Sequence, residues 1–170
     1  MLETFNMFAA YNSWANRLVY AAAGALDRQS FEKDTGAFFG SMKGTLNHIL
    51  VADRIWLHRF TGEGEAPKRL DEILYEEFEL LRAAREAMDA RITDWVAGLS
   101  EADIAGTFTY TPVTTPEPVT QRLAPALSHL FNHQTHHRGQ AHMILTSLGR
   151  PSLGLDLIYF QRTDAGRQFA

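Results

Sequence analysis

The chain has 170 residues, of which 45% are hydrophobic, and it contains no cysteine. This size and apolar content suit a single domain over residues 1–170 with a substantial core. Its 20 acidic and 16 basic residues leave a formal charge of −4 and no basic patch, which argues against nucleic acid as a partner. Without cysteine the chain can form no disulfide and no thiolate ligand, so thiol chemistry requires a thiol from outside.

The hydropathy pattern and the N-terminal segment bear on location. No segment approaches the roughly 20 apolar residues of a membrane span, so no membrane partner is expected. Residues 1–18 lack the basic start and uninterrupted apolar run of a signal peptide. We therefore expect a cytoplasmic protein.

Three amphipathic helices are predicted in the first hundred residues, because apolar side chains recur there at steps of three and four. They cover residues 5–22, 41–60 and 70–99. Gly24 and a polar stretch end the first helix, and Ser41 is placed to act as the N-cap of the second. Three pairs on the third helix have the spacing of solvent-exposed ion pairs: Glu79–Arg82, Arg82–Glu86 and Arg85–Asp89.

The second half of the chain contains a non-helical stretch followed by a fourth long helix. Residues 107–122 alternate β-branched side chains and include three prolines, which favours a short β-hairpin or an extended crossover. The fourth helix is predicted from about Leu123 to Gly149, with a short helix over residues 152–162. Four long helices with one irregular crossover before the last predict an all-α fold, a four-helix bundle.

Three of the seven histidines fall on apolar helix faces. His133 and His137 are one turn apart, about 60° and about 20° from the centre of the apolar stripe of the fourth helix. His48 lies at the rim of the apolar stripe of the second helix. A buried imidazole needs a partner for each ring nitrogen. The pattern therefore indicates either hydrogen-bonded core histidines or a metal site.

Three neutral imidazoles suit zinc, nickel, copper, iron or cobalt, and they leave a coordination position open, as in catalytic sites. Of the other histidines, His58 and His142 face solvent. His129 and His136 lie at the edge of the apolar stripe of the fourth helix. If His129, His136 or an acidic residue filled the open position, the metal would be structural. On a helical wheel of the second helix, Asp53 lies about 140° from His48, so we expect Asp53 to form a buried hydrogen bond or ion pair.

Three sequence blocks resemble the DinB/YfiT-like superfamily of small helical-bundle proteins. YNSWAN at residues 11–16 resembles the first-helix motif of that family, and GTLNHILVADRIWLHRF at residues 44–60 resembles its second helix. NHQTHHRGQ at residues 132–140 resembles its HxxxHRGQ signature. The resemblance extends over nearly the whole chain and implies an up-down-down-up bundle, a divalent metal ion (zinc or nickel is expected) and frequent homodimers. The three metal ligands of the family correspond to His48, His133 and His137.

Characterised relatives in this superfamily include metal-dependent transferases that use low-molecular-weight thiols such as bacillithiol or mycothiol, and a mycothiol-dependent isomerase. The resemblance therefore implies a metal-dependent transferase in which a small thiol attacks an electrophilic substrate. Two alternatives remain: a metal-dependent hydrolase, and a non-catalytic, stress-associated dimer with a structural metal. Gln140 is expected to support the site, and Arg138 to form a structural ion pair. Trp14, Trp56 and Trp95 are candidate anchors of a homodimer or, alternatively, core residues.

Overall fold

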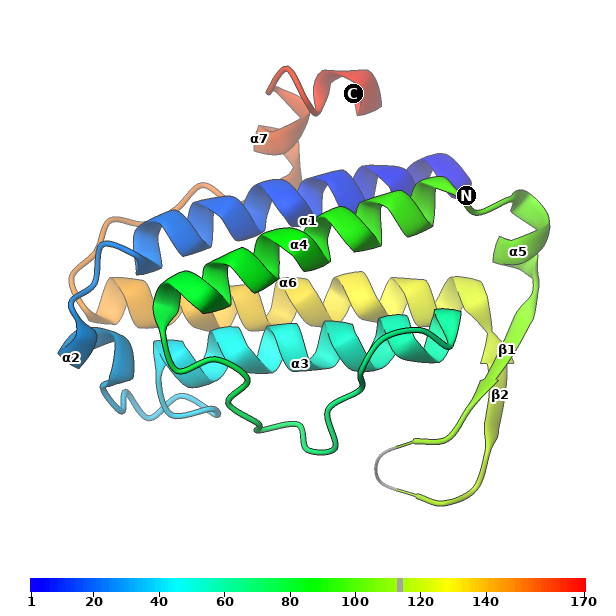
Figure 1. The fold of residues 1–170 in the computed structure, drawn as a ribbon. Coiled ribbons are helices and arrows are strands. Elements are labelled where there is room, and N and C mark those ends of the chain that lie inside the picture. The colour runs from blue at the N-terminus through cyan, green and yellow to red at the C-terminus, as the bar shows by residue number, and fades with distance from the viewer. Residues whose placement is uncertain (113–114) are drawn as a thin grey trace.

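The computed structural model describes residues 1–112 and 115–170, in which four long helices form a bundle (Figure 1). These helices are α1 (Leu2–Ala23), α3 (Met42–Thr61), α4 (Phe78–Ala97) and α6 (Leu123–Ser147). α1 and α6 run in one direction along the bundle, and α3 and α4 run in the other. Each long helix packs chiefly against two of the others. The expected all-α, up-down-down-up bundle is confirmed.

Short elements connect and follow the long helices. They are α2 (Arg28–Glu32), α5 (Glu101–Ala105), β1 (Thr107–Tyr110), β2 (Val119–Arg122), α7 (Leu157–Gln161) and the 3₁₀ helix η1 (Arg167–Phe169). β1 and β2 pair in antiparallel fashion, with Thr107 opposite Arg122 and Tyr110 opposite Val119. The predicted hairpin before the last long helix is confirmed, although residues 113–114 of that stretch lie outside the described residues.

Local signals in the sequence account for the ends of several helices. Ser41 accepts a hydrogen bond from the backbone N–H of Gly44, so the predicted N-cap of α3 is confirmed. The five-residue helices α2 and α5 were not predicted, yet each begins at a capping side chain, Asp27 and Ser100 respectively. The helix predicted over residues 152–162 is shorter than expected, because α7 begins only at Leu157.

The connection between α3 and α4 returns along the whole bundle (Figure 1). Because the two helices run in the same direction, residues 62–77 must span the length of a 20-residue helix, about 30 Å. The prediction of a helix from Leu70 is therefore wrong, and α4 begins at Phe78. Leu70 and Ile73 have the spacing of a buried helical face, but they lie in this connection and remain 46% and 38% exposed.

Polar side chains from all four long helices meet inside the bundle. This ionic cluster consists of Asn12, Asn16, Asp53, Arg85, Asp89, Gln134 and Arg138. Arg85 forms ion pairs with Asp53 at 2.5 Å and with Asp89 at 3.0 Å, and all three side chains are buried. The expected buried pairing of Asp53 is confirmed. The prediction that Arg85 and Asp89 form an exposed pair is wrong, because α1 and α3 cover α4 there.

Arg138 belongs to the same cluster but pairs with no carboxylate among the described residues. Its guanidinium donates hydrogen bonds to four neutral oxygens, in Asn12, Asn16, Gln134 and Thr135. The prediction of an ion pair for Arg138 is therefore wrong. Gln134 in turn donates a hydrogen bond to Asp53, so neutral amides connect Arg138 to the buried acid.

The exterior of the bundle bears on two further expectations. Glu79 and Arg82 form the predicted exposed ion pair at 2.5 Å, whereas the described residues hold no ion pair between Arg82 and Glu86. None of the helices in residues 1–112 and 115–170 combines the length and the apolarity needed to cross a membrane.

The three tryptophans expected to anchor a homodimer have aromatic partners within the chain. Each ring lies within 6 Å of another: Trp14 of Phe160, Trp56 of Phe60, and Trp95 of Phe60. All three remain half-buried rather than fully enclosed. The homodimer therefore stays a prediction, which sedimentation analysis over micromolar concentrations would test.

Candidate metal centre

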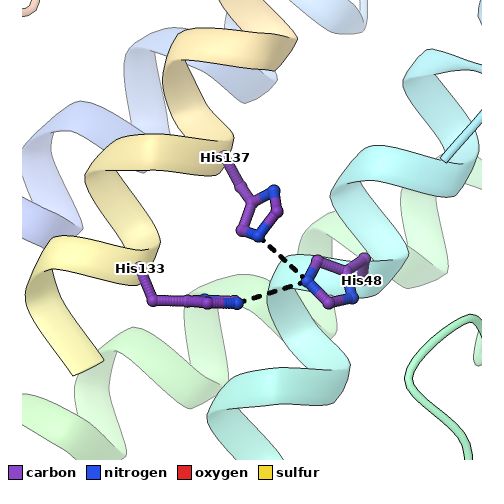
Figure 2. A group of neighbouring side chains, drawn as sticks. All are labelled: His48, His133 and His137. Carbon is purple, nitrogen blue, oxygen red and sulfur yellow. Dashed lines mark hydrogen bonds between the residues drawn. The ribbon is translucent and has the colours of Figure 1, made fainter. Parts of the chain in front are cut away.

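Three imidazoles meet between α3 and α6 (Figure 2). His48 projects from α3, while His133 and His137 project from successive turns of α6. His48 Nε2 lies 3.3 Å from His133 Nε2 and 3.2 Å from His137 Nε2. One ligand atom from each residue lies within 4.8 Å of the other two. We call these three residues the histidine cluster, and their convergence agrees with the helical wheel.

Two of the imidazoles are held by hydrogen bonds at their outer nitrogens. His48 Nδ1 lies 2.7 Å from the backbone carbonyl oxygen of Leu70, and His137 Nδ1 lies 2.7 Å from Gln140 Oε1. Both oxygens only accept hydrogen bonds, so both Nδ1 atoms must carry the proton. In a neutral imidazole the other nitrogen, Nε2, then has a free lone pair. The His48–His137 contact therefore places two lone pairs 3.2 Å apart with no proton between them.

This arrangement fits a metal ion. Two nitrogens bound to one tetrahedral zinc at about 2.0–2.1 Å lie roughly 3.3–3.4 Å from each other. The Nε2 separations of His48 from His133 and from His137, 3.3 and 3.2 Å, are close to that spacing. Hydrogen bonds at the outer nitrogens also fix the ring orientation, which is a common feature of histidine ligands in metal sites. The histidine cluster can therefore hold a divalent cation.

Electrostatics favour a metal over a proton in this position. Burial and the neighbouring imidazoles lower the pKa of His133 from 6.5 to about 3. Burial lowers the pKa of His137 to about 4 despite its hydrogen bond to Gln140, and it also lowers the pKa of His48. All three rings are thus neutral near pH 7, which is the form that binds metals.

Phe39 forms one wall of the site. Its ring stacks on His48 with the centroids 3.7 Å apart, and its plane is inclined by 63° to the His137 ring, with the centroids 5.5 Å apart. The loop that carries Phe39 lies directly against α3 at Gly44, where a Cβ atom would be 2.0 Å from the Phe39 carbonyl oxygen. Glycine at this position therefore permits the close approach that places an apolar ring over the imidazole.

A cavity of about 200 Å³ borders the site on another side. It is lined by His48, Ala52, Ile55, Trp56, Arg59, Leu70, His129 and His133. Two of the three imidazoles therefore face a space that a small molecule can enter. A larger cavity of about 470 Å³ lies among α1, α6 and residues 155–157, but none of the three histidines lines it. The smaller cavity is accordingly the one relevant to chemistry at the histidine cluster.

The two histidines at the stripe edge do not join the cluster. His129 lines the cavity with its ring centroid 5.7 Å from that of His133, but the group of close ligand atoms does not include it. His136 is exposed, and its Nε2 lies 3.3 Å from Gln140 Nε2. Among the described residues, no histidine or acidic side chain therefore supplies a fourth ligand.

The remaining two histidines bind loops. His58 Nδ1 lies 2.8 Å from the carbonyl oxygen of Gly64, beyond the end of α3. His142 was expected to be solvated, and this is wrong. Its ring is half-buried, and Nε2 accepts a hydrogen bond of 2.9 Å from the backbone N–H of Leu153. The chain after α6 folds back over that face of the helix, which explains the difference.

Sequence reasoning found the three imidazoles and the supporting Gln140, but it missed Leu70 and Phe39. Leu70 acts through a backbone carbonyl, which its side chain does not reveal. Phe39 lies in an irregular loop, where apolar spacing carries no information on direction. The FFG sequence before Ser41 is the one available hint, since two adjacent aromatic residues are unusual in an otherwise polar loop.

Comparison with known proteins gives a relative and a family for this chain. The chain is 23% identical over 154 residues to "Protein DinB" of Bacillus subtilis (strain 168), and the match covers 86% of this chain and 87% of that protein. The model of the DinB family matches residues 1–167, which include all four long helices and the histidine cluster. The chain belongs to the DinB family.

Proposed function

We propose that the protein is a divalent-metal-dependent transferase that uses a low-molecular-weight thiol against an electrophilic substrate. His48, His133 and His137 would hold the metal. When bound there, a divalent ion lowers the pKa of a ligated thiol and so provides a thiolate near neutral pH. The observation that carries the proposal is a cluster of three neutral imidazoles beside a cavity, with no fourth ligand among the described residues.

The roles of the surrounding residues follow from their contacts. The Leu70 carbonyl and Gln140 hold two imidazoles with their Nε2 lone pairs directed inward. Phe39 covers His48 and keeps water from that side of the site. In the transfer itself, the thiol gives its proton to solvent and its sulfur forms a bond to the electrophilic atom. The leaving group departs with the electrons of the bond that breaks.

Thiol transfer is favoured over hydrolysis by the lining of the cavity. Activation of water commonly uses a histidine or a carboxylate as general base, yet among the described residues no aspartate or glutamate lines this cavity. The one histidine there outside the cluster, His129, is a weakened base because burial lowers its pKa. Asp53, the buried acid on the same helix as His48, is engaged by Arg85 and Gln134. A thiol that has already lost its proton needs no such base, and a chain without cysteine must obtain that thiol from outside.

A structural metal would require a closed site. Structural zinc is almost always held by four protein ligands, whereas three protein ligands and an open position are typical of catalytic zinc. The described residues bring three ligand atoms together, and His129 lies outside that group. This count supports an exchangeable position and therefore a catalytic role.

Spectroscopy on cobalt- or nickel-loaded protein tests the proposal. A small thiol such as 2-mercaptoethanol should produce a sulfur-to-metal charge-transfer band, and His137→Ala should abolish it. The matched control is His58→Ala, since His58 binds a loop carbonyl away from the cluster. If no thiol produces the band and cleavage of esters or amides proceeds without thiol, the hydrolase is the correct reading. If neither reaction occurs and a fourth protein ligand is found, the metal is structural.

A further inference from the structure

Arg59 occupies an unusual position near the end of α3. Its guanidinium carbon lies 4.6 Å from the centre of the Trp56 ring and 4.4 Å from the centre of the Tyr110 ring. Stacking on two aromatic rings stabilises the cation and restricts the plane of the guanidinium group. The side chain is thereby held half-buried rather than extended into solvent.

The polar atoms of Arg59 form no hydrogen bond or ion pair with residues 1–112 and 115–170. By contrast, Arg54, earlier on the same helix, donates a hydrogen bond of 2.7 Å to the Tyr75 hydroxyl. Arg122 and Arg162 also lack polar partners within the described chain, but both are exposed and meet water. Arg59 is therefore a half-buried cation whose guanidinium donors have no partner in the described protein.

Arg59 and the histidine cluster face the same space. The cavity of about 200 Å³ is lined by Arg59 together with His48 and His133. Its other lining residues are apolar or aromatic except for His129, and none is acidic. Burial lowers the pKa of Arg59, as expected for a guanidinium withdrawn from water without a compensating carboxylate. The cavity thus carries a positive charge next to the proposed metal.

We propose that Arg59 binds a carboxylate or similar small anionic group on the molecule that reaches the histidine cluster, an inference that rests on the proposed function. A guanidinium offers its donors in a planar fork that matches two carboxylate oxygens. The cavity is smaller than the roughly 300 Å³ at which pockets for drug-sized ligands begin. The ligand is therefore compact: one end reaches the metal and a negatively charged end lies on Arg59.

Two three-carbon thiols, one ending in a carboxylate and the other in a neutral hydroxyl, test this inference. Cobalt-loaded protein is titrated with 3-mercaptopropionate and with 3-mercapto-1-propanol, and the charge-transfer band reports binding of each. Arg59→Gln should weaken binding of the carboxylate thiol by about tenfold, since a charge-assisted hydrogen bond is lost. Binding of the neutral thiol should change by less than about twofold, which also shows that the variant is folded and loaded.

A matched control removes the same charge elsewhere. Arg162→Gln acts on an exposed arginine and should leave both affinities unchanged. The inference is overturned if Arg59→Gln leaves the affinity for 3-mercaptopropionate unchanged, or if both thiols lose affinity equally.

A second titration separates this inference from the proposed function. If neither thiol binds wild-type protein, the proposed thiol transfer is wrong. Binding of propionate then tests the role of Arg59, and the fluorescence of Trp56, whose ring contacts the Arg59 guanidinium, reports that binding. Saturable binding that Arg59→Gln removes supports the anion site, and no binding overturns it. Where a thiol does bind, propionate is added together with 3-mercapto-1-propanol. If the two bind at the same time, the anionic group that Arg59 binds belongs to the electrophile. If they compete, that group belongs to the thiol.

Discussion

The bundle interior contains two clusters of polar side chains that find their partners in different ways. In the ionic cluster, Arg85 lies between Asp53 and Asp89. The side-chain amide of Gln134 connects Asp53 to Arg138. Its charges balance within the protein, with two arginines against two aspartates. In the histidine cluster, the inner nitrogens face one another, and the described chain supplies no cation for their lone pairs.

The two clusters are built from the same helix. On α6, His133 and His137 face α3, while Gln134 and Arg138, one position later in each case, take part in the ionic cluster. A shift of one residue rotates a side chain by about 100°, so one stretch of sequence serves two neighbouring faces. The comparison teaches that burial alone does not mark a functional site. In the ionic cluster the charged side chains are paired within the chain and support the fold, whereas in the histidine cluster the Nε2 lone pairs lack such a partner and are available to a ligand.

The largest expected effect comes from breaking the ionic cluster. Asp53→Asn removes one carboxylate and leaves Arg85 partly uncompensated in the interior. Removing one partner of a buried ion pair costs about 3–5 kcal/mol, so the free energy of unfolding should fall by that amount. Urea denaturation of metal-free protein measures it. A loss below about 1 kcal/mol would show that the cluster does not hold the helices together.

Gln140 gives the next effect, on metal affinity rather than on folding. Its side-chain oxygen accepts the hydrogen bond from His137 Nδ1. Loss of such a partner lowers metal affinity by about 10–100-fold, and this is the result expected for Gln140→Leu in a competition titration with a chelator. Gln140→Glu keeps an acceptor and should retain the affinity. Equal affinities of all three proteins would remove Gln140 from the site.

The histidine cluster should also make the stability of metal-free protein depend on pH. The folded-state pKa values of His133 and His137 are about 3 and about 4, below the ordinary 6.5. Between the lowered values and pH 6.5, the unfolded chain therefore binds more protons than the folded protein. The free energy of unfolding should therefore be fully retained above about pH 6.5 and decrease as the pH falls towards 4. A variant with both residues replaced by alanine should show a smaller decrease. The same slope in both proteins would contradict the assigned burial of the rings.

The smallest effect is expected for the stability of a single histidine variant. In metal-free protein, His137→Ala removes a ring whose inner lone pair has no favourable partner, so the free energy of unfolding should change by less than about 1 kcal/mol. Urea denaturation alongside Asp53→Asn provides the comparison. A loss as large as that of Asp53→Asn would mean that the histidine cluster is structural and would erase the difference between the two clusters.

Helix periodicity explains how much of this could be predicted from the sequence. His133 and His137 were found because the 3.6-residue repeat places them on the apolar face of α6, and Ser41 marked the start of α3. The end of the α3–α4 connection was missed because Leu70 and Ile73 keep a helical spacing. Whether such residues form a helix depends on the relative direction of α3 and α4, which is a property of the whole fold.

The partners of charged residues were harder to predict. Arg85 and Asp89 are four residues apart, and that spacing is the same on an exposed face and on a buried one. Only the packing of α1 and α3 over α4 distinguishes the two cases. Phe39 and the Leu70 carbonyl reach His48 from loops, whose courses do not follow from a repeating pattern.

Metal content tests the central claim most directly. Protein purified without an affinity tag is analysed for bound metal in the wild type and in five alanine variants, of His48, His133, His137, His58 and His142. The wild type should bind about one divalent ion per chain, as expected for a single three-histidine site. The first three variants should lose it, whereas His58→Ala and His142→Ala should retain it, because those two rings bind loops away from the cluster. Equal metal content in all five variants would contradict the account.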